Sequence, residues 1–379
     1  MIKLVDITGK VLSGEWGSED EEGMGIPVLR TTNFTNEGII NYNNVVTRKI
    51  NKKNISKKYL QDGDIIIEKS GGSDKQPVGR VVYFKGPENT YLFNNFTGVI
   101  RVRDKKRWLP KYVFYSLYYN YFRGGTRPFE NKTTGLHNLK TDAYISTYEL
   151  EEKSYEEQVN ICSKLDKLNQ VIRLQKNELI QLNNLVKSRF IELFGDVIYN
   201  DKKWECKRFS DITTSRLGKM LDTKHQTGTC QYPYLANFNV QWFRFELNNL
   251  NEMDFDEKEQ VEFCLKDGDL LVCEGGEIGR CAVWHSQIKK CFFQKALHRV
   301  RCNQKIILPD YLSWWFKYNC DNGGFSVIEG AKATISHLTG AKMKVLNVVV
   351  PPIELQEQFV VFLRETDKSK HFCEMEAAA

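Results

Sequence analysis

Arginine, lysine and asparagine side chains gather on turn-rich segments at matching places in two halves of the sequence. The segment LRTTNF carries Arg30 and Asn33, and its counterpart LANFNVQWFRF carries Asn237 and Arg244. Arginine and lysine can donate to guanine edges, whereas asparagine and glutamine can pair with adenine edges. One such loop alone is typical of an ordinary solvated surface, but its recurrence in both halves favours nucleic-acid binding.

Glycine-rich runs add a second binding feature, because glycines let a backbone approach phosphates closely. KSGGSDKQPVGR covers residues 69–80 and EGGEIGR covers 274–280, and RGGTRPFENKTTG and GAKATISH follow later in the two halves. From all these segments, the candidate DNA-binding residues are Arg30, Asn33, Lys69, Lys75, Arg80, Arg123, Arg127, Lys132, Asn237, Asn239, Gln241, Arg244, Arg280, Lys332, Thr334 and His337.

Catalytic and metal-binding signatures are missing from the sequence. It contains neither G-x-G-x-x-G nor G-x-x-x-x-G-K-[ST], so dinucleotide and P-loop sites are not expected. The Asn/Asp-Pro-Pro-aromatic tetrad of amino-methyltransferases is also missing. The six histidines show no H-x-x-x-H spacing, which argues against a metal site. The Asp-Gly-Asp sequences at 62–64 and 267–269 are more typical of a turn entering a buried strand than of a carboxylate pair. We therefore predict a non-catalytic chain without a cofactor or metal of its own.

Composition limits the class of protein. The 379 residues carry 54 Lys and Arg against 48 Asp and Glu, and this length suggests two or three domains. No apolar run reaches the ~18–20 residues that cross a bilayer, and the start MIKLVDITGK lacks the apolar core of a signal peptide. Ten cysteines without a C-x-x-C pair are typical of reduced thiols. These features predict a cytoplasmic protein without a membrane segment.

An internal repeat with a period of about 200 residues divides the chain. PVLRTTNF corresponds to PYLANFNV, DGDIII to DGDLLV, LPKYVF to LPDYLS, and Glu157-Gln158 to Glu357-Gln358. The predicted parts are globular domains at 1–150 and 199–351, a central helix at 151–198 and a shortened second helix at 352–379. The globular domains are basic, with 23 Lys and Arg against 16 Asp and Glu in the first and 21 against 18 in the second.

Each globular domain is expected to be an α+β fold. Apolar runs such as 65–67 and 270–273 predict short strands, because Gly-Gly, Asn-Gly and Asp-Gly pairs punctuate the sequence around them. LPKYVFYSLYYNYF and LPDYLSWWFKYN each predict a helix that begins near a proline. The predicted architecture is therefore two similar domains in tandem, separated by long helices.

The central helix is predicted from an apolar heptad stripe. No glycine or proline occurs from Ser154 to Phe194, so a long coiled-coil-type helix is expected, with Gly195 as its C-cap. The stripe has to be buried, and the second helical segment, packed antiparallel, is its nearest partner; pairing with another chain is the alternative. The predicted helix-pairing residues are Leu165, Leu168, Ile172, Leu179, Leu182, Val186, Phe359 and Phe362.

Taken together, these motifs resemble the specificity subunit of type I restriction–modification systems. The resemblance rests on YPYLANFNVQWFRF, DGDLL, GGEIGR, PPIELQEQF, EEQVNICSKLDKL and SRFIELFGD, in that family's order over nearly the whole chain. It departs from the family at two places: the first domain lacks a counterpart of Trp204 and of the residues before it, and HFCEMEAAA does not resemble a family helix end.

The resemblance implies a sequence-specific DNA-binding subunit with two target-recognition domains, each reading one half of a bipartite double-stranded target. The helices would space the domains and dock two DNA-methyltransferase subunits, and restriction/translocase subunits would join that core. S-adenosylmethionine, ATP and Mg would be held by the partner subunits. Two alternatives stay open: a stand-alone DNA-binding or architectural protein, and a coiled-coil adaptor that does not bind DNA. A neighbouring methyltransferase gene would argue against the first, and duplex binding would argue against the second.

Overall fold

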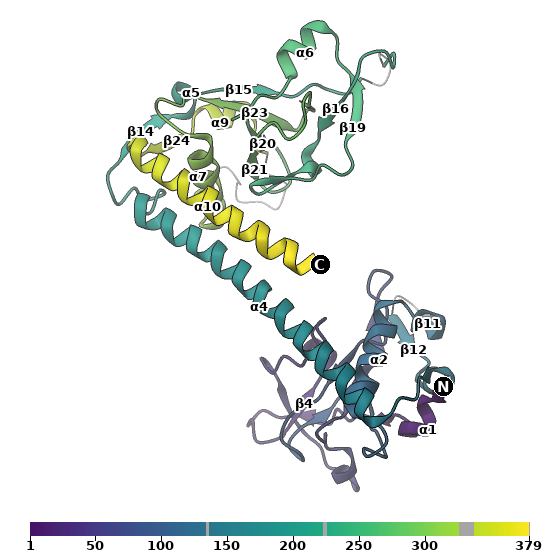
Figure 1. Ribbon diagram of the computed structural model, residues 1–379. Helices are drawn as coiled ribbons and strands as arrows, with labels where there is room; N and C mark the ends of the chain where they lie inside the picture. Colours follow the sequence, from purple (N-terminus) through teal and green to yellow (C-terminus); the bar gives the residue numbers. More distant parts are fainter. Residues whose placement is uncertain (134–135, 223–225, 326–336, 379) are drawn as a thin grey trace. The chain divides into compact units, whose positions relative to one another are not determined.

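The computed structural model describes residues 1–133, 136–222, 226–325 and 337–378 (Figure 1). The chain divides into two compact units, which we call unit 1 (Met1–Val171) and unit 2 (Ile172–Ala379). Helix α4 (Tyr155–Phe194) crosses the boundary between them. Each unit therefore contains one globular domain and one end of α4.

Unit 1 is built on small sheets and a helix that covers the central one. The central antiparallel sheet has the order β2 (Leu12–Ser13), β10 (Thr97–Ile100), β6 (Ile65–Glu68), β8 (Val81–Tyr83). A second sheet has the order β3 (Ser18–Glu19), β5 (Val46–Lys49), β4 (Ile26–Leu29), β9 (Leu92–Phe93). A third has the order β11 (Glu130–Thr133), β12 (Leu136–Leu139), β7 (Ser70–Gly72), and β1 (Ile2–Lys3) pairs with β13 (Glu149–Leu150). The helices and 3-10 turns are α1 (Leu4–Thr8), η1 (Thr31–Asn33), η2 (Ile55–Lys58), α2 (Pro110–Phe122), η3 (Arg127–Phe129) and α3 (Thr141–Thr147).

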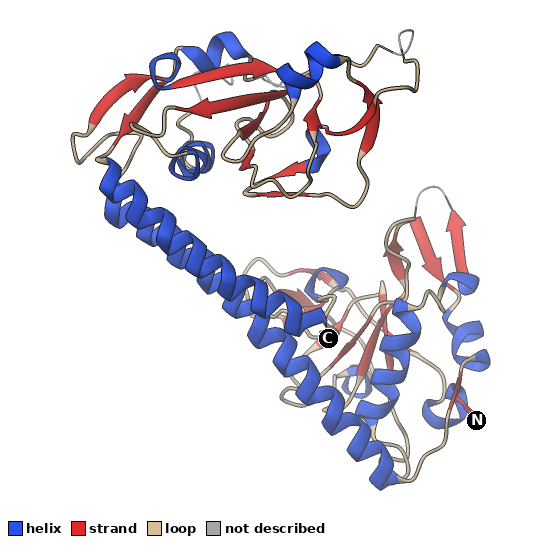
Figure 2. Ribbon diagram, turned by 45° about the horizontal axis from the view of Figure 1, so that its top comes forward, coloured by secondary structure: helices blue, strands red, loops and turns tan. Residues whose placement is uncertain are grey.

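Unit 2 repeats this plan. Its central antiparallel sheet has the order β15 (Thr213–Leu217), β23 (Leu297–Cys302), β20 (Leu270–Cys273), β21 (Cys281–Val283). A second sheet has the order β19 (Asn251–Asp254), β16 (Gln231–Leu235), β22 (Phe292–Phe293). Two strand pairs complete the unit: β14 (Glu205–Arg208) with β24 (Asn347–Val350), and β17 (Val240–Gln241) with β18 (Arg244–Phe245). The helices and 3-10 turns are α5 (Phe209–Ile212), η5 (Asn237–Asn239), α6 (Glu257–Phe263), α7 (Pro309–Asp321), α9 (Gly340–Lys344) and α10 (Ile353–Ala378). Figure 2 shows the strands and helices of both units.

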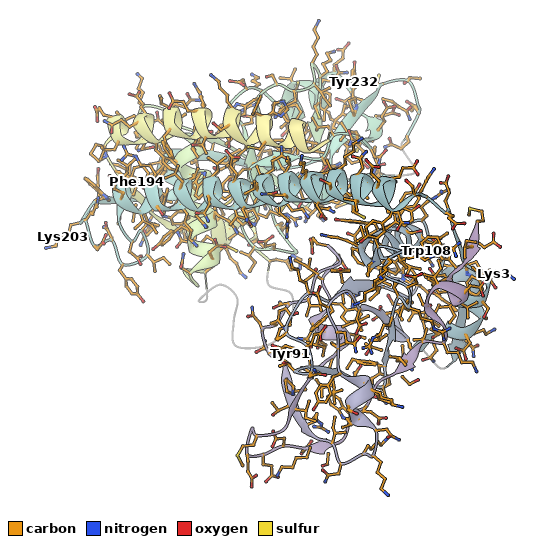
Figure 3. All side chains as sticks on the ribbon, turned by 60° about the horizontal axis from the view of Figure 1, so that its bottom comes forward. Lys3, Tyr91, Trp108, Phe194, Lys203 and Tyr232 are labelled. Atoms are coloured by element: carbon orange, nitrogen blue, oxygen red, sulfur yellow. The ribbon has the colours of Figure 1, made fainter. Side chains whose placement is uncertain are left out.

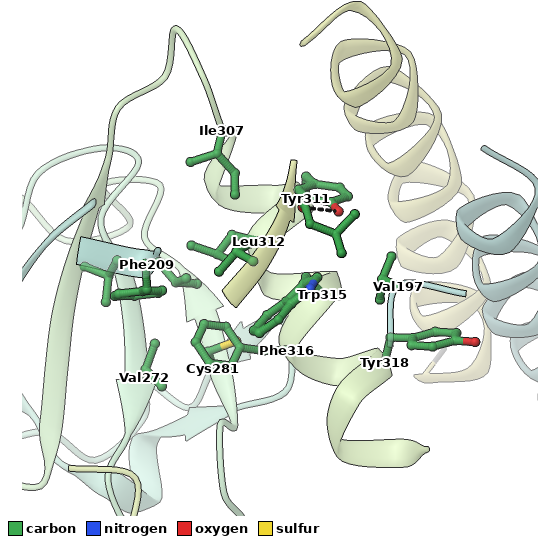
Figure 4. Close-up of a cluster of buried hydrophobic side chains, with 14 of the residues drawn as sticks. Val197, Phe209, Val272, Cys281, Ile307, Tyr311, Leu312, Trp315, Phe316 and Tyr318 are labelled. Carbon is green, nitrogen blue, oxygen red and sulfur yellow. Dashed lines mark hydrogen bonds between the residues drawn. The ribbon is translucent and has the colours of Figure 1, made fainter. Parts of the chain in front are cut away.

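The centre of each unit is a short strand that is buried on both faces. In β6, Ile65 and Ile67 belong to the hydrophobic cluster that includes residues of α2, whereas Ile66 belongs to the hydrophobic cluster that includes residues of β4 and β9. Leu270 and Val272 of β20 likewise belong to the cluster with α7, and Figure 4 shows Val272 in that cluster. Successive side chains of a strand point to opposite faces. A run of consecutive apolar residues therefore suits a strand covered on both sides, and the short strands predicted at 65–67 and 270–273 are confirmed.

The two long helices pair in unit 2. The Phe359 ring of α10 lies 5.4 Å from the rings of both Phe190 and Phe194, so α10 begins beside the C-terminal end of α4 and runs antiparallel to it (Figures 1 and 2). Figure 3 marks Phe194 near the end of α4. Gly195 ends the helix at φ 73°, with its N–H donating to the Ile191 carbonyl at 2.8 Å. The predicted antiparallel pair and its glycine cap are confirmed for this unit.

The predicted pairing residues do not all lie in this seam. Val186 and Phe359 are fully buried, and the half-buried members of the set are Leu165, Ile172, Leu179, Leu182 and Phe362. The prediction that Leu168 is a pairing residue is corrected, because its side chain is 57% exposed.

A buried glutamine joins each long helix to its own domain. In unit 1, Gln158 accepts from Leu109 N–H at 2.8 Å and donates to the Arg107 carbonyl at 2.9 Å. In unit 2, Gln356 accepts from Leu308 N–H at 2.9 Å. Gln158 therefore corresponds to Gln356, and the sequence match with Glu357-Gln358 was two residues out of register.

Candidate nucleic-acid interface

In unit 1, buried polar groups fix the loop that carries Arg30. The Asn33 side chain is 2% exposed; its Oδ1 accepts from Arg30 N–H at 3.0 Å, and its Nδ2 donates to the Asn41 carbonyl at 3.0 Å. Arg80 reaches the same turn and donates to the carbonyls of Thr31 at 3.1 Å and Phe34 at 3.3 Å. These groups hold η1 in place.

Unit 2 uses the same construction. Asn239 is 1% exposed and its Oδ1 accepts from Ala236 N–H at 2.9 Å. Arg280 donates to Asn237 Oδ1 at 2.6 Å, and the Asn237 amide donates to the Gly275 carbonyl at 2.9 Å. The prediction that Asn33 and Asn239 read bases is therefore corrected, because their amides are buried and already bonded. Arg80, Asn237 and Arg280 likewise bond within the fold.

The loop between β7 and β8 presents the most accessible basic group of the glycine-rich run in unit 1. Lys75 is exposed at its tip, and Ser73 N–H donates to the Gln76 carbonyl at 2.6 Å to close the turn. His137 of β12 lies under this loop, with Nδ1 3.1 Å from Glu130 and Nε2 3.7 Å from Asp74. Lys69 is half-buried, and burial lowers the pKa of its ammonium group. The loop is thus held at its base by His137, and it exposes the Lys75 ammonium group at its tip.

The corresponding part of unit 2 lines a hollow, whereas that of unit 1 is an exposed loop. The hollow has a volume of about 530 Å³, and its lining includes Met220, Gly275, Lys295 and His337. His337 is exposed there, as is Lys295. Sequence reasoning missed Met220 and Lys295. Residue type gave no signal for them. In the structure, Gly218 lets the segment before Met220 approach Gln294, which also lines the hollow, because a Cβ on Gly218 would lie 2.3 Å from the Gln294 carbonyl oxygen.

The remaining candidates are dispersed. Arg123, Arg127 and Arg244 are exposed, and Arg244 forms an ion pair with Glu246. Arg30 and Gln241 are half-buried, and Gln241 donates to the Phe238 carbonyl at 2.9 Å. Lys132 lies in β11, but its side chain falls outside the described part, as do residues Lys332 and Thr334. DNA contact by the exposed residues stays a prediction.

Both Asp-Gly-Asp turns have a structural role. Asp64 is buried and receives two hydrogen bonds of 2.7 Å from Arg101, and Asp269 is buried and receives bonds of 2.6 and 3.1 Å from Arg301. A buried carboxylate is stable when it is paired and hydrogen-bonded in this way. Within the described residues, no cluster of three His, Cys, Asp or Glu side chains could hold a metal ion, and no helix has the length and apolarity to cross a membrane.

His298, next to Glu274 of the hollow, is expected to make the stability of unit 2 depend on pH. Its side chain is buried, its Nε2 has no hydrogen-bond partner among the described residues, and burial lowers its pKa, while Glu274 at 3.9 Å acts in the opposite direction. The unfolded chain therefore binds a proton at a higher pH than the folded chain does. Stability should fall as the pH drops through the ordinary histidine value of about 6.5.

We expect the urea midpoint of unit 2 to decrease between pH 7.5 and 5.5, and His298→Gln to flatten this decrease. The exposed His337 provides the matched control, since His337→Gln should leave the slope unchanged. Equal slopes for the wild-type chain and His298→Gln would show that another group causes the dependence.

A family model describing the type I restriction modification DNA specificity domain matches residues 2–184 and again 201–372. The chain belongs to this type I specificity family. The two matches agree with the internal repeat and with the two similar domains described above. No curated protein matches the chain at a significant level.

Solved structures support the same fold for this specificity-family chain. The S subunit of the type I restriction–modification system of M. genitalium is 13% identical, with a TM-score of 0.58 over 99% of this chain and 91% of that one. A chain from a structural study of complex assembly and conformational transition in a type I R-M system is 12% identical, with a TM-score of 0.50 over 99% of this chain and 94% of that one. The resemblance noted in the sequence is confirmed at the level of family and fold.

Proposed function

We propose that each globular domain of this specificity-family chain reads one half of a bipartite double-stranded DNA target. The supporting observation is that the domains share their buried anchors but differ in what they expose. Asn33 and Asn239 hold equivalent turns, whereas Lys75 lies on an exposed loop in one domain and a hollow lined by Lys295 lies at the corresponding place in the other. Two domains with the same buried scaffold but different exposed residues are suited to two half-sites of different sequence.

The helices complete this proposal. α4 joins the two domains and fixes the length of chain between them, and the paired helices offer surfaces to two DNA-methyltransferase subunits. Restriction/translocase subunits would join the same core, in keeping with the complex assembly named for the 12%-identical relative. S-adenosylmethionine, ATP and Mg would be bound by those partners, and this chain would contribute DNA recognition without catalysing a step.

Exchange of one domain tests the proposal. Residues 199–351 are replaced by the same region of a relative with a known, different target, and methylated sites are mapped in cells that also express the methyltransferase subunit. We expect one half of the methylated sequence to change completely while the other half and the gap stay as before. The reciprocal exchange of residues 1–150 serves as the control and should change the opposite half. A change in both halves from one exchange would contradict independent reading.

A further inference from the structure

In unit 2, the end of α4 covers one face of α7. The Phe194 ring lies 4.7 Å from the Tyr311 ring, and the Phe190 ring lies 5.7 Å from the Tyr318 ring. Tyr318 is only 9% exposed, and burial together with the nearby Asp196 carboxylate raises its pKa to about 12. α10 contacts another part of α7, where Gln356 bonds to Leu308. Parts of both long helices, α4 and α10, therefore lie against α7.

In unit 1, the first turns of α4 are the only part of the two long helices that the described residues place against the equivalent helix α2. Both helices begin with Leu-Pro, and both end in a turn in which a glycine N–H donates to an asparagine carbonyl, at 2.9 Å for Gly125 with Asn120 and 2.8 Å for Gly324 with Asn319. Tyr119 thus occupies the position of Tyr318, but it is 62% exposed. The first turns of α4 take the place of α10 against α2, through Lys111 and Asp166 at 2.7 Å.

The neighbouring face of α4 is uncovered as well. The correspondence of Gln158 with Gln356 places Leu168 at the position of Thr366. Thr366 is 6% exposed, whereas Leu168 is 57% exposed. At Tyr119, α2 therefore leaves open the surface that the phenylalanine-bearing end of α4 covers at Tyr318 in unit 2, and at Leu168 α4 leaves open a position that is buried in α10. None of the described residues takes that place.

We propose that this surface docks the end of a helix from a second polypeptide that carries two phenylalanines four residues apart, followed by Gly-Asp. We call the surface the α2–α4 face; it comprises Tyr115, Tyr119 and Phe122 of α2 with Ile161, Leu165 and Leu168 of α4. The occupant has the chemistry of Phe190, Phe194, Gly195 and Asp196, because that segment covers the equivalent face in unit 2. The inference does not depend on the proposed function.

Charge and position both suit this occupant. Arg123 is exposed at the end of α2, and its guanidinium lies over the Tyr119 ring at 5.4 Å and donates to the Tyr119 hydroxyl at 3.3 Å. It would meet the aspartate of the incoming helix, much as Tyr318 meets Asp196. The face is also continuous with the α2–α4 contact, where the Tyr115 hydroxyl donates to Asp166 at 2.5 Å. Exposed aromatic side chains grouped next to an interface are typical of a docking site.

A peptide of residues 183–204 provides the probe, because it contains the covering segment of unit 2. Its fluorescence anisotropy is followed on titration with the full chain, and saturable 1:1 binding with a dissociation constant on the order of micromolar is expected. A peptide with Phe190→Ala and Phe194→Ala should bind at least about tenfold more weakly, since two buried rings are lost.

Variants of the chain locate the binding surface. Tyr119→Asp with Phe122→Asp should weaken peptide binding at least about tenfold, and because both side chains are exposed the fold should persist, as circular dichroism would verify. Met24→Asp changes an 80%-exposed residue of the same unit and should leave binding unchanged.

Three results would overturn the proposal: no saturable binding; equal peptide binding by the Tyr119/Phe122 variant with methyltransferase binding unchanged; or equal peptide binding by that variant together with loss of methyltransferase binding. The second result would mean that the peptide displaces the chain's own α4 end in unit 2. The third would assign the face to a methyltransferase. None of these measurements involves DNA, so failure here is distinguishable from failure of half-site reading.

Discussion

Replacing Phe190 by alanine should lower the free energy of unfolding of unit 2 by about 3–5 kcal/mol, the range measured for removing a fully buried aromatic side chain. Phe190 is 0% exposed and its ring lies within 5.4 Å of those of Phe194 and Phe359. It also faces Tyr311 of α7. The cavity would therefore open where α4, α7 and α10 meet. Urea denaturation followed by tryptophan fluorescence measures the loss, because Trp314 lies 6.1 Å from Phe190.

The adjacent residue supplies a matched control. Ile191 sits one position further along α4 and is 42% exposed, so Ile191→Ala should change the free energy of unfolding by no more than about 0.5 kcal/mol. If both variants lost the same stability, α4 would not be anchored in unit 2 through Phe190. A loss confined to Phe190→Ala would identify this three-helix contact as the main support of the helix pair.

The elements of the fold follow from the sequence because their patterns are local. Consecutive apolar residues at 65–67 suit a strand covered on both faces, and a stripe repeating every seven residues requires a helix partner. Leu168 belongs to that stripe by spacing alone. Whether anything covers it depends on how far the second helix extends beside the first, and this is a tertiary property that spacing does not report.

The candidate interface was less predictable, because residue type does not reveal which bonds a side chain already makes. Asn33 and Arg80 have the chemistry to contact DNA, yet both bond to the backbone of their own turn. Their recurrence as Asn239 and Arg280 was the informative signal, and it indicates a shared scaffold. Residues that differ between the repeats, such as Lys75, are better candidates for sequence-specific contact than residues that the repeats share.

Lengthening α4 should change the gap between half-sites while both half-sites stay the same. We place the insertion of four helix-forming residues after Val171, which is 48% exposed, because Asn169 still bonds to Tyr115 of unit 1 at 3.2 Å and unit 2 begins at Ile172. Four residues add about 6 Å of helix and about 40° of rotation. One base pair of DNA adds about 3.4 Å, with ~10 base pairs in a turn. The added rotation therefore corresponds to about one base pair and the added length to about two.

We accordingly expect the preferred gap to increase by one to two base pairs, which mapping of methylated sites in cells would measure. The matched control inserts the same four residues in the turn after Glu21, an exposed position of unit 1 away from α4, and should leave the gap unchanged. An insertion in α4 that preserved the original gap would show that some other contact, such as one made by the methyltransferase subunits, sets the distance. We assign base reading to the domains and spacing to the helix. An insertion that altered the bases read in either half would contradict this separation. Because the insertion lies outside the seam formed by Phe190 and Phe359, a change in gap would report the length of α4 rather than disruption of the helix pair.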